Sequence, residues 1–136
     1  PNALFDHIIV RATFQMKQRE IKLLAICLGA ISNEMLKDGI DLAQLQPLCV
    51  IITKDGELNL KLQDDIMGQQ VNLIVYPVEK WRNHSYNDYT MLICILEELC
   101  HYYYAITDEI VVKHKVITVI QNWIDKNVKI EELYDI

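Results

Sequence analysis

The chain has 136 residues, of which 51% are apolar, and its formal net charge is −6. This length and apolar content suit one domain with one core, so we expect residues 1–136 to form a single domain. The negative charge disfavours a nucleic-acid surface, which needs clustered Lys and Arg, and no apolar run is long enough to predict a membrane span. The first residues lack the blocks of a signal peptide, and the four cysteines form no C-x-x-C pair, so we expect a cytoplasmic protein without a disulfide framework.

The first part of the chain predicts a strand followed by a buried helix. Residues 8–16 alternate between apolar and polar side chains, which is the period of a strand. From about Lys17 the period becomes helical, and Lys37-Asp38-Gly39 supplies a stop. The middle of this helix is almost wholly apolar, so we expect it to be buried on more than one side.

The middle of the chain predicts three short strands, at residues 48–53, 58–62 and 71–78. Asp55-Gly56 is a strong hairpin signal, and residues 67–70 have the composition of a second turn. These short connections favour hairpins among the three strands. Pro77 cannot donate a ladder hydrogen bond, which places the last of them at a sheet edge.

The last part of the chain predicts two helices after a polar loop at residues 81–86. Asn87 or Asp88 can cap the first helix, which runs to about Tyr104, and Thr107 can cap the second. The tail, residues 126–136, is mixed and acidic, and we expect part of it to be loose. The fold class is therefore α+β, with a small mixed sheet of about four strands, a buried first helix and the later helices packed on one face.

One stretch of the penultimate helix has the composition of a chemical site: Glu97-Glu98-Leu99-Cys100-His101. Helical spacing places Glu97 and His101 on one face, together with Cys94 and Glu98. Two carboxylates beside a histidine are costly in a cleft without a balancing cation. The stretch differs by one residue from H-E-x-x-H, in which two histidines bind Zn²⁺ and the glutamate takes a proton from the metal-bound water.

This segment resembles the active-site helix of the zincin metallopeptidases, and the order of elements resembles a small zincin core. The resemblance implies that His101 is the second metal-binding histidine and that Glu98 is the catalytic general base. In gluzincin-type members the third ligand is an acidic residue on the next helix, for which Glu109 fits slightly better than Asp108. Glu97 stands where the family has its first histidine, and a carboxylate can also bind zinc. The implied cofactor is therefore zinc, held by Glu97, His101 and Glu109.

The same residues also have ordinary structural explanations. Glu97 and Glu98 suit a solvated helix face, Asp108 and Glu109 suit the first turn of any helix, and a histidine is favourable near a helix C-terminus. Three hypotheses follow. In the first, the chain is a zincin-like domain with impaired catalysis that binds a protein or peptide partner. In the second, it is a zinc-dependent metallopeptidase with a Glu/His/Glu ligand set. In the third, it is an unrelated small α+β interaction domain, for which a homodimer is one expected assembly.

Overall fold

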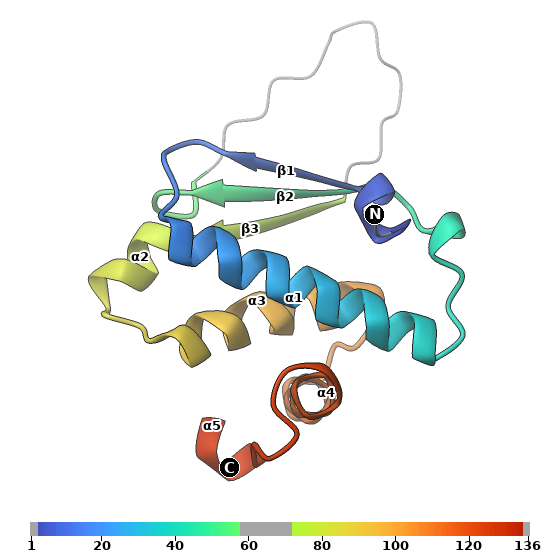
Figure 1. Cartoon of the computed structure of the whole chain (residues 1–136). Helices are drawn as coiled ribbons and strands as arrows, with labels where there is room; N and C mark the ends of the chain where they lie inside the picture. The colour runs from blue at the N-terminus through green and yellow to red at the C-terminus, as the bar shows by residue number, and fades with distance from the viewer. Residues whose placement is uncertain (1–2, 58–71, 135–136) are drawn as a thin grey trace, which may run out of the picture.

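A parallel three-stranded sheet forms one layer of the protein in the computed structural model, which describes residues 3–57 and 72–134 (Figure 1). The strands are β1 (Ile8–Ala12), β2 (Leu48–Thr53) and β3 (Leu73–Pro77), in the order β1-β2-β3. Helix α1 (Gln18–Lys37) connects β1 to β2, and these two strands are parallel. β2 is buried along almost its whole length, as expected for a central parallel strand.

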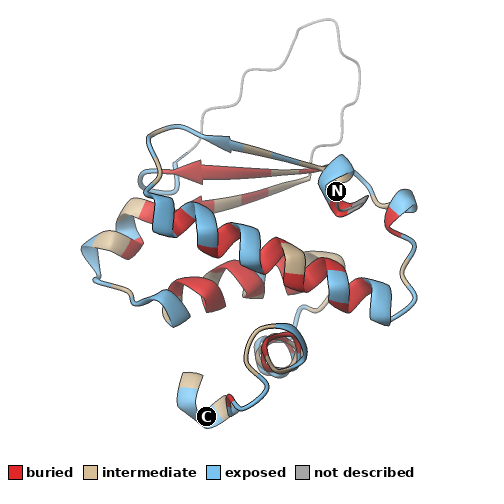
Figure 2. Cartoon of the chain, in the orientation of Figure 1, coloured by how far each residue is buried: buried red, intermediate tan, exposed pale blue. Residues whose placement is uncertain are grey.

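The helices lie on one side of the sheet. Figure 1 shows α1 and α3 (Asp88–Tyr103) packed beneath the strands, with α4 (Glu109–Trp123) against both helices and farther from the sheet. Short helices complete the described chain: α2 (Val78–Asn83), α5 (Ile130–Leu133) and the 3-10 turns Ala3–His7 and Leu42–Gln44. Figure 2 shows the buried residues where the sheet meets α1 and α3 and where the helices meet each other. Within the described ranges, no helix has the length and apolar character needed to cross a membrane.

Local signals in the sequence set the ends of the helices. Gly39 follows α1 with a φ of +78°, a left-handed conformation that favours glycine, and the predicted stop is confirmed. Asn87 caps α3 by accepting a hydrogen bond from the Thr90 amide at 2.8 Å. α4 begins at Glu109 with Asp108 as its cap, so the prediction that Thr107 is the cap is wrong by one residue.

The predicted hairpin arrangement of the middle strands is wrong for β2 and β3. β2 and β3 are direct parallel neighbours, in a register from Cys49 opposite Leu73 to Thr53 opposite Pro77. A turn signal such as Asp55-Gly56 indicates local chain reversal, but it does not determine which strands become neighbours. The predicted strand at residues 58–62 and the turn at 67–70 lie outside the described residues, so the structure describes three of the expected strands.

Two local boundaries also differ from the sequence prediction. The first strand ends at Ala12 instead of continuing to residue 16, although Phe14 and Met16 still pack against the core. The segment at residues 81–86, predicted to be a loop, begins inside helix α2. Trp81 explains this difference, because its ring is buried and packs against the Tyr76 ring at a centroid distance of 5.6 Å.

Candidate functional site

The Glu97-to-His101 stretch forms the last turns of α3. Leu96, Leu99 and Cys100 are fully buried and anchor this part of the helix in the core. Glu97 is half-buried and Glu98 is exposed, so the polar face predicted from helical spacing is present. The stretch is therefore held rigidly on one side and reaches the surface on the other.

His101 contacts the loop between α3 and α4 and the first residue of α4. Ala105, with a φ of +52°, turns the chain after α3, and the backbone oxygen of Ile106 forms a hydrogen bond with His101 Nδ1. His101 Nε2 then lies 3.4 Å from Glu109 Oε1 on α4. The structure thus brings together two of the three predicted metal ligands, although Glu109 is 67% exposed and His101 only 22%.

The hydrogen bond from Nδ1 has a chemical consequence for Nε2. A carbonyl oxygen only accepts, so Nδ1 carries a proton, and in the neutral imidazole Nε2 presents a lone pair. That lone pair faces a carboxylate oxygen, and two acceptors at this distance repel unless a proton or a cation lies between them. Metal-binding histidines commonly donate their second ring N–H to a backbone carbonyl, so His101 has the orientation of a ligand.

Glu97 has a different partner. Its Oε1 accepts a hydrogen bond from the Tyr134 hydroxyl at 2.8 Å, and Lys113 Nζ lies 5.5 Å from the centre of the Tyr134 ring. Burial, and then the Glu97 carboxylate, raise the pKa of Tyr134, so its hydroxyl stays protonated as a donor. Within residues 3–57 and 72–134, no three His, Cys, Asp or Glu side chains are close enough to share one ion. The donor set therefore fits a metal only in part.

The two cysteines near the motif are poor nucleophiles. Burial, followed by the charges of Glu97 and Glu98, raises the pKa of the Cys94 thiol to about 11. Burial raises the pKa of the Cys100 thiol to about 12. Both thiols are therefore protonated at neutral pH, whereas the thiolate is the reactive form.

A buried carboxylate fixes α4 relative to α1. Glu34 is fully buried and accepts hydrogen bonds from Lys115 Nζ at 2.8 Å, Asn122 Nδ2 at 2.9 Å and Trp123 Nε1 at 2.9 Å. Lys115 also contacts Asp38 at 3.1 Å. This network anchors the helix that carries Glu109, so it positions the candidate site from a distance.

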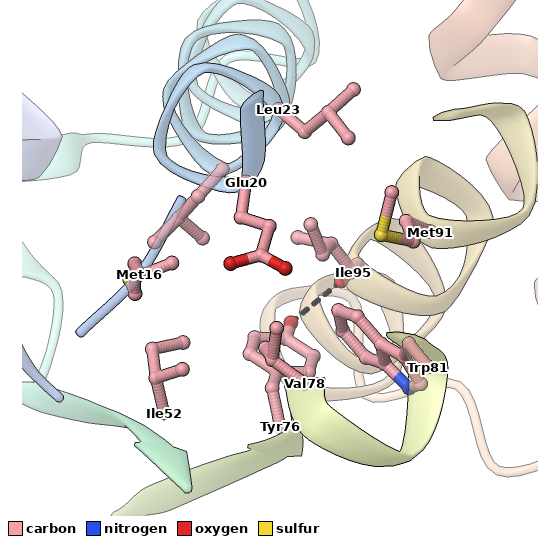
Figure 3. Close-up of a pocket in the computed structure, with 10 residues that line it drawn as sticks. Met16, Glu20, Leu23, Ile52, Tyr76, Val78, Trp81, Met91 and Ile95 are labelled. Atoms are coloured by element: carbon pink, nitrogen blue, oxygen red, sulfur yellow. Dashed lines mark hydrogen bonds between the residues drawn. The ribbon is translucent and has the colours of Figure 1, made fainter. Parts of the chain in front are cut away.

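The small cavity in Figure 3 lies on the other side of α3, next to the sheet. Its volume is about 10 Å³, space for at most one water molecule. The Glu20 carboxylate at its edge is already paired with Arg82 and accepts from the Lys17 amide at 2.8 Å. The Tyr76 hydroxyl donates to the Ile95 carbonyl at 2.7 Å. The cavity is thus a feature of core packing and not a ligand site.

The sequence did not predict the positions of Tyr134 and Lys113 near the motif or the hydrogen-bond network of Glu34. Tyr134 is 37 residues from Glu97, and the residues around it carry no motif. Glu34 lies in the predicted buried helix, where a carboxylate among apolar residues was a usable signal, because buried charges need partners.

Comparisons with protein-family models, curated proteins and solved structures gave no significant match to this chain. The zincin-like character of the chain therefore stays a prediction from its sequence.

Proposed function

We propose that this chain is a zincin-like domain with impaired catalysis that acts as a protein-binding or regulatory module. The main supporting observation concerns Glu97, which stands in the position of the family's first metal ligand. Its carboxylate accepts a hydrogen bond from the Tyr134 hydroxyl, whereas His101 lies next to Glu109. A zinc ion would then have two donors from this chain, one fewer than a catalytic zinc site normally has. No hydrolytic step follows from such an arrangement.

The exposed position of Glu98 also supports impaired catalysis. A general base beside a zinc-bound water works best in a cavity that excludes bulk solvent and holds the reacting groups in place. Glu98 is exposed on the surface of α3, so its carboxylate is open to solvent. A substitution of Glu98 by Gln would therefore leave the function of a binding module intact.

The surface beside Glu109 is a suitable place for a partner protein or peptide. Ile110 and Val111 follow Glu109 in the first turn of α4, and they are 62% and 52% exposed. Exposed apolar side chains next to a polar cluster are typical of recognition surfaces. The net charge of −6 disfavours nucleic acid as the partner.

The second candidate is a working zinc metallopeptidase. It is favoured by one observation, the orientation of His101, whose Nδ1 is bonded to a carbonyl while Nε2 faces a carboxylate. In that case His101 and Glu109 would hold zinc with Glu97, and the bound ion would activate water for peptide hydrolysis.

A binding experiment with matched variants distinguishes the candidates. Peptides selected on the wild-type protein from a displayed library should bind Glu98→Gln with an unchanged Kd. Val111→Asp should weaken the same peptides about tenfold or more, because it places a charge in an apolar contact. Loss of peptide binding in Glu98→Gln would contradict the proposal, and cleavage of the selected peptides by wild type alone would favour the metallopeptidase.

A further inference from the structure

Three neighbouring hollows form a groove around the start of α3. The first has a volume of about 370 Å³ and is lined by residues of α1 and α2 and by the loop before α3. The second lies between the starts of α1 and α3, and the third, of about 310 Å³, lies between α3 and the residues around α5. Asn87 lines all three hollows, so they adjoin one another. Figure 1 shows these elements at one end of the molecule, on the left. We name this surface the α3 groove.

The first hollow lies beyond the carboxyl ends of two strands. Lys17 and Arg19 stand at the start of α1, which follows β1, and Arg82 belongs to α2, which follows β3 directly. Open parallel sheets commonly bind their ligands in the crevice outside the carboxyl ends of the strands. The position of the hollow therefore favours a binding site, and this argument is independent of the motif on α3.

The first hollow is positively charged, although the chain as a whole has a net charge of −6. Three basic side chains line it, those of Lys17, Arg19 and Arg82, together with one carboxylate, that of Glu20. Arg82 forms an ion pair with Glu20, whose side chain is only 5% exposed, so these two charges balance each other. Lys17 and Arg19, which are both exposed, therefore supply the charge that a ligand can use.

Arg19 already holds a carboxylate at the surface. Its Nε donates to Asp88, and one terminal nitrogen donates to the Tyr86 carbonyl at 3.1 Å, which fixes the plane of the guanidinium. The side chains of Arg19 and Asp88 are 53% and 63% exposed. An exposed ion pair contributes little to stability, so a carboxylate of a ligand can take the place of Asp88. The guanidinium group suits this exchange, because its geometry matches a carboxylate.

The far end of the groove has the opposite charge. Asp125 and Glu132 line the third hollow, with the buried side chains of Ile93 and Val128 as an apolar floor. Tyr89 lies between the two ends, because it lines the second and third hollows, and it is 38% exposed. Its hydroxyl donates to Asp125 at 2.9 Å, which holds the ring in place. A tyrosine ring offers a bound chain a large contact area at low entropic cost.

We propose that the α3 groove binds a short peptide segment of a partner protein, with acidic side chains in the first hollow and a basic side chain in the third. Complementary charge carries this choice of partner. The overall negative charge repels an acidic peptide, so its binding requires the local positive charge of the first hollow. This inference rests on the proposed role as a binding module, but it concerns a surface other than that of Ile110 and Val111 and does not depend on the motif.

Amide NMR spectra of the isotope-labelled full chain test this binding, because they detect weak complexes and locate them. The probe is a peptide with glutamates at one end, a leucine in the middle and lysines at the other end. Its addition should shift the amides around Arg19 and Asn87 most strongly. Arg19→Gln should raise the Kd about tenfold, because it removes a charged donor to the peptide carboxylate. Lys80→Gln is the matched control. It removes the same charge from an exposed position of α2 that does not line the hollows, and it should change the Kd by less than about twofold.

The third hollow has its own comparison. Replacing the lysines of the peptide with serines should raise the Kd severalfold for the wild-type protein. The increase should be smaller for Glu132→Gln, because its third hollow has lost one of the two carboxylates that pair with the lysines. Equal increases in the two proteins would contradict the proposed direction of the peptide in the groove.

Several outcomes would overturn the proposal. Absence of binding is one, and equal effects of Arg19→Gln and Lys80→Gln are another, because they would show that net charge alone attracts the peptide. A mass that rises with concentration in wild type but not in Arg19→Gln would make a second copy of the chain the occupant. Val111→Asp should bind this peptide as wild type does. If the groove fails these tests while selected peptides still depend on Val111, the proposed function stands without the groove.

Discussion

Replacing Glu34 with Gln tests the account of how α4 is positioned. The Gln side chain keeps one oxygen, which can accept from Asn122 and Trp123, but it presents an amide N–H₂ to Lys115. Breaking a buried ion pair by removing one partner costs about 3–5 kcal/mol. Lys115 retains Asp38 at 3.1 Å, so we place the loss near the lower limit, at about 3 kcal/mol. For a chain of this length that loss lowers Tm by about 10 °C.

Urea unfolding followed by circular dichroism measures this change directly. Glu131→Gln is the matched control, because Glu131 is exposed on α5 and its substitution should change the free energy of unfolding by less than about 0.5 kcal/mol. A Glu34→Gln protein that is within about 0.5 kcal/mol of wild type would refute the reasoning.

The same substitution should have an effect that depends on pH. Burial alone raises the pKa of Glu34, but hydrogen bonds from Lys115, Asn122 and Trp123 outweigh it and lower this pKa below its ordinary value of 4.5. A carboxyl whose pKa is lower in the folded state contributes stability that is full above 4.5 and is lost as the pH falls through the folded-state value. The difference between wild type and Glu34→Gln should therefore be constant near pH 7 and shrink below about pH 4.5.

Two further comparisons follow from the hydrogen bonds. Tyr76→Phe removes a buried hydroxyl that donates to a carbonyl of α3, so it should lower the free energy of unfolding in urea by about 1–2 kcal/mol. Tyr103→Phe should be neutral or stabilising, because the Tyr103 hydroxyl is buried without a partner among the described residues. Equal losses in the two variants would contradict this account. Asp108→Ala should lower the free energy of unfolding by about 1 kcal/mol, because it removes the cap of α4. Thr107→Ala should lower it by less than half as much. The reverse order would show that Thr107 is the cap.

The sequence predicted the elements whose signals are local. The helical period and the stop at Gly39 defined α1, and Asn87 marked the start of α3. The polar face with Glu97 and His101 also followed from spacing alone, because a helix fixes which residues share a side. These predictions needed no knowledge of tertiary contacts.

The features that the sequence did not predict depend on contacts between distant residues. The parallel pairing of β2 with β3 depends on how the sheet assembles and not on a turn signal. Helix α2 forms where Trp81 packs against Tyr76. The hydrogen bond between Tyr134 and Glu97 joins the end of the chain to α3, and no local pattern indicates such a contact.

The proposed loss of catalysis is tested most directly by a peptidase assay on the zinc-saturated protein. A quenched-fluorescence peptide library would be incubated with wild type and with Glu98→Gln at the same zinc concentration. We expect the two proteins to give the same rate, at the level of the buffer containing zinc alone. Hydrolysis by wild type that disappears in Glu98→Gln would contradict the account and make Glu98 a catalytic residue.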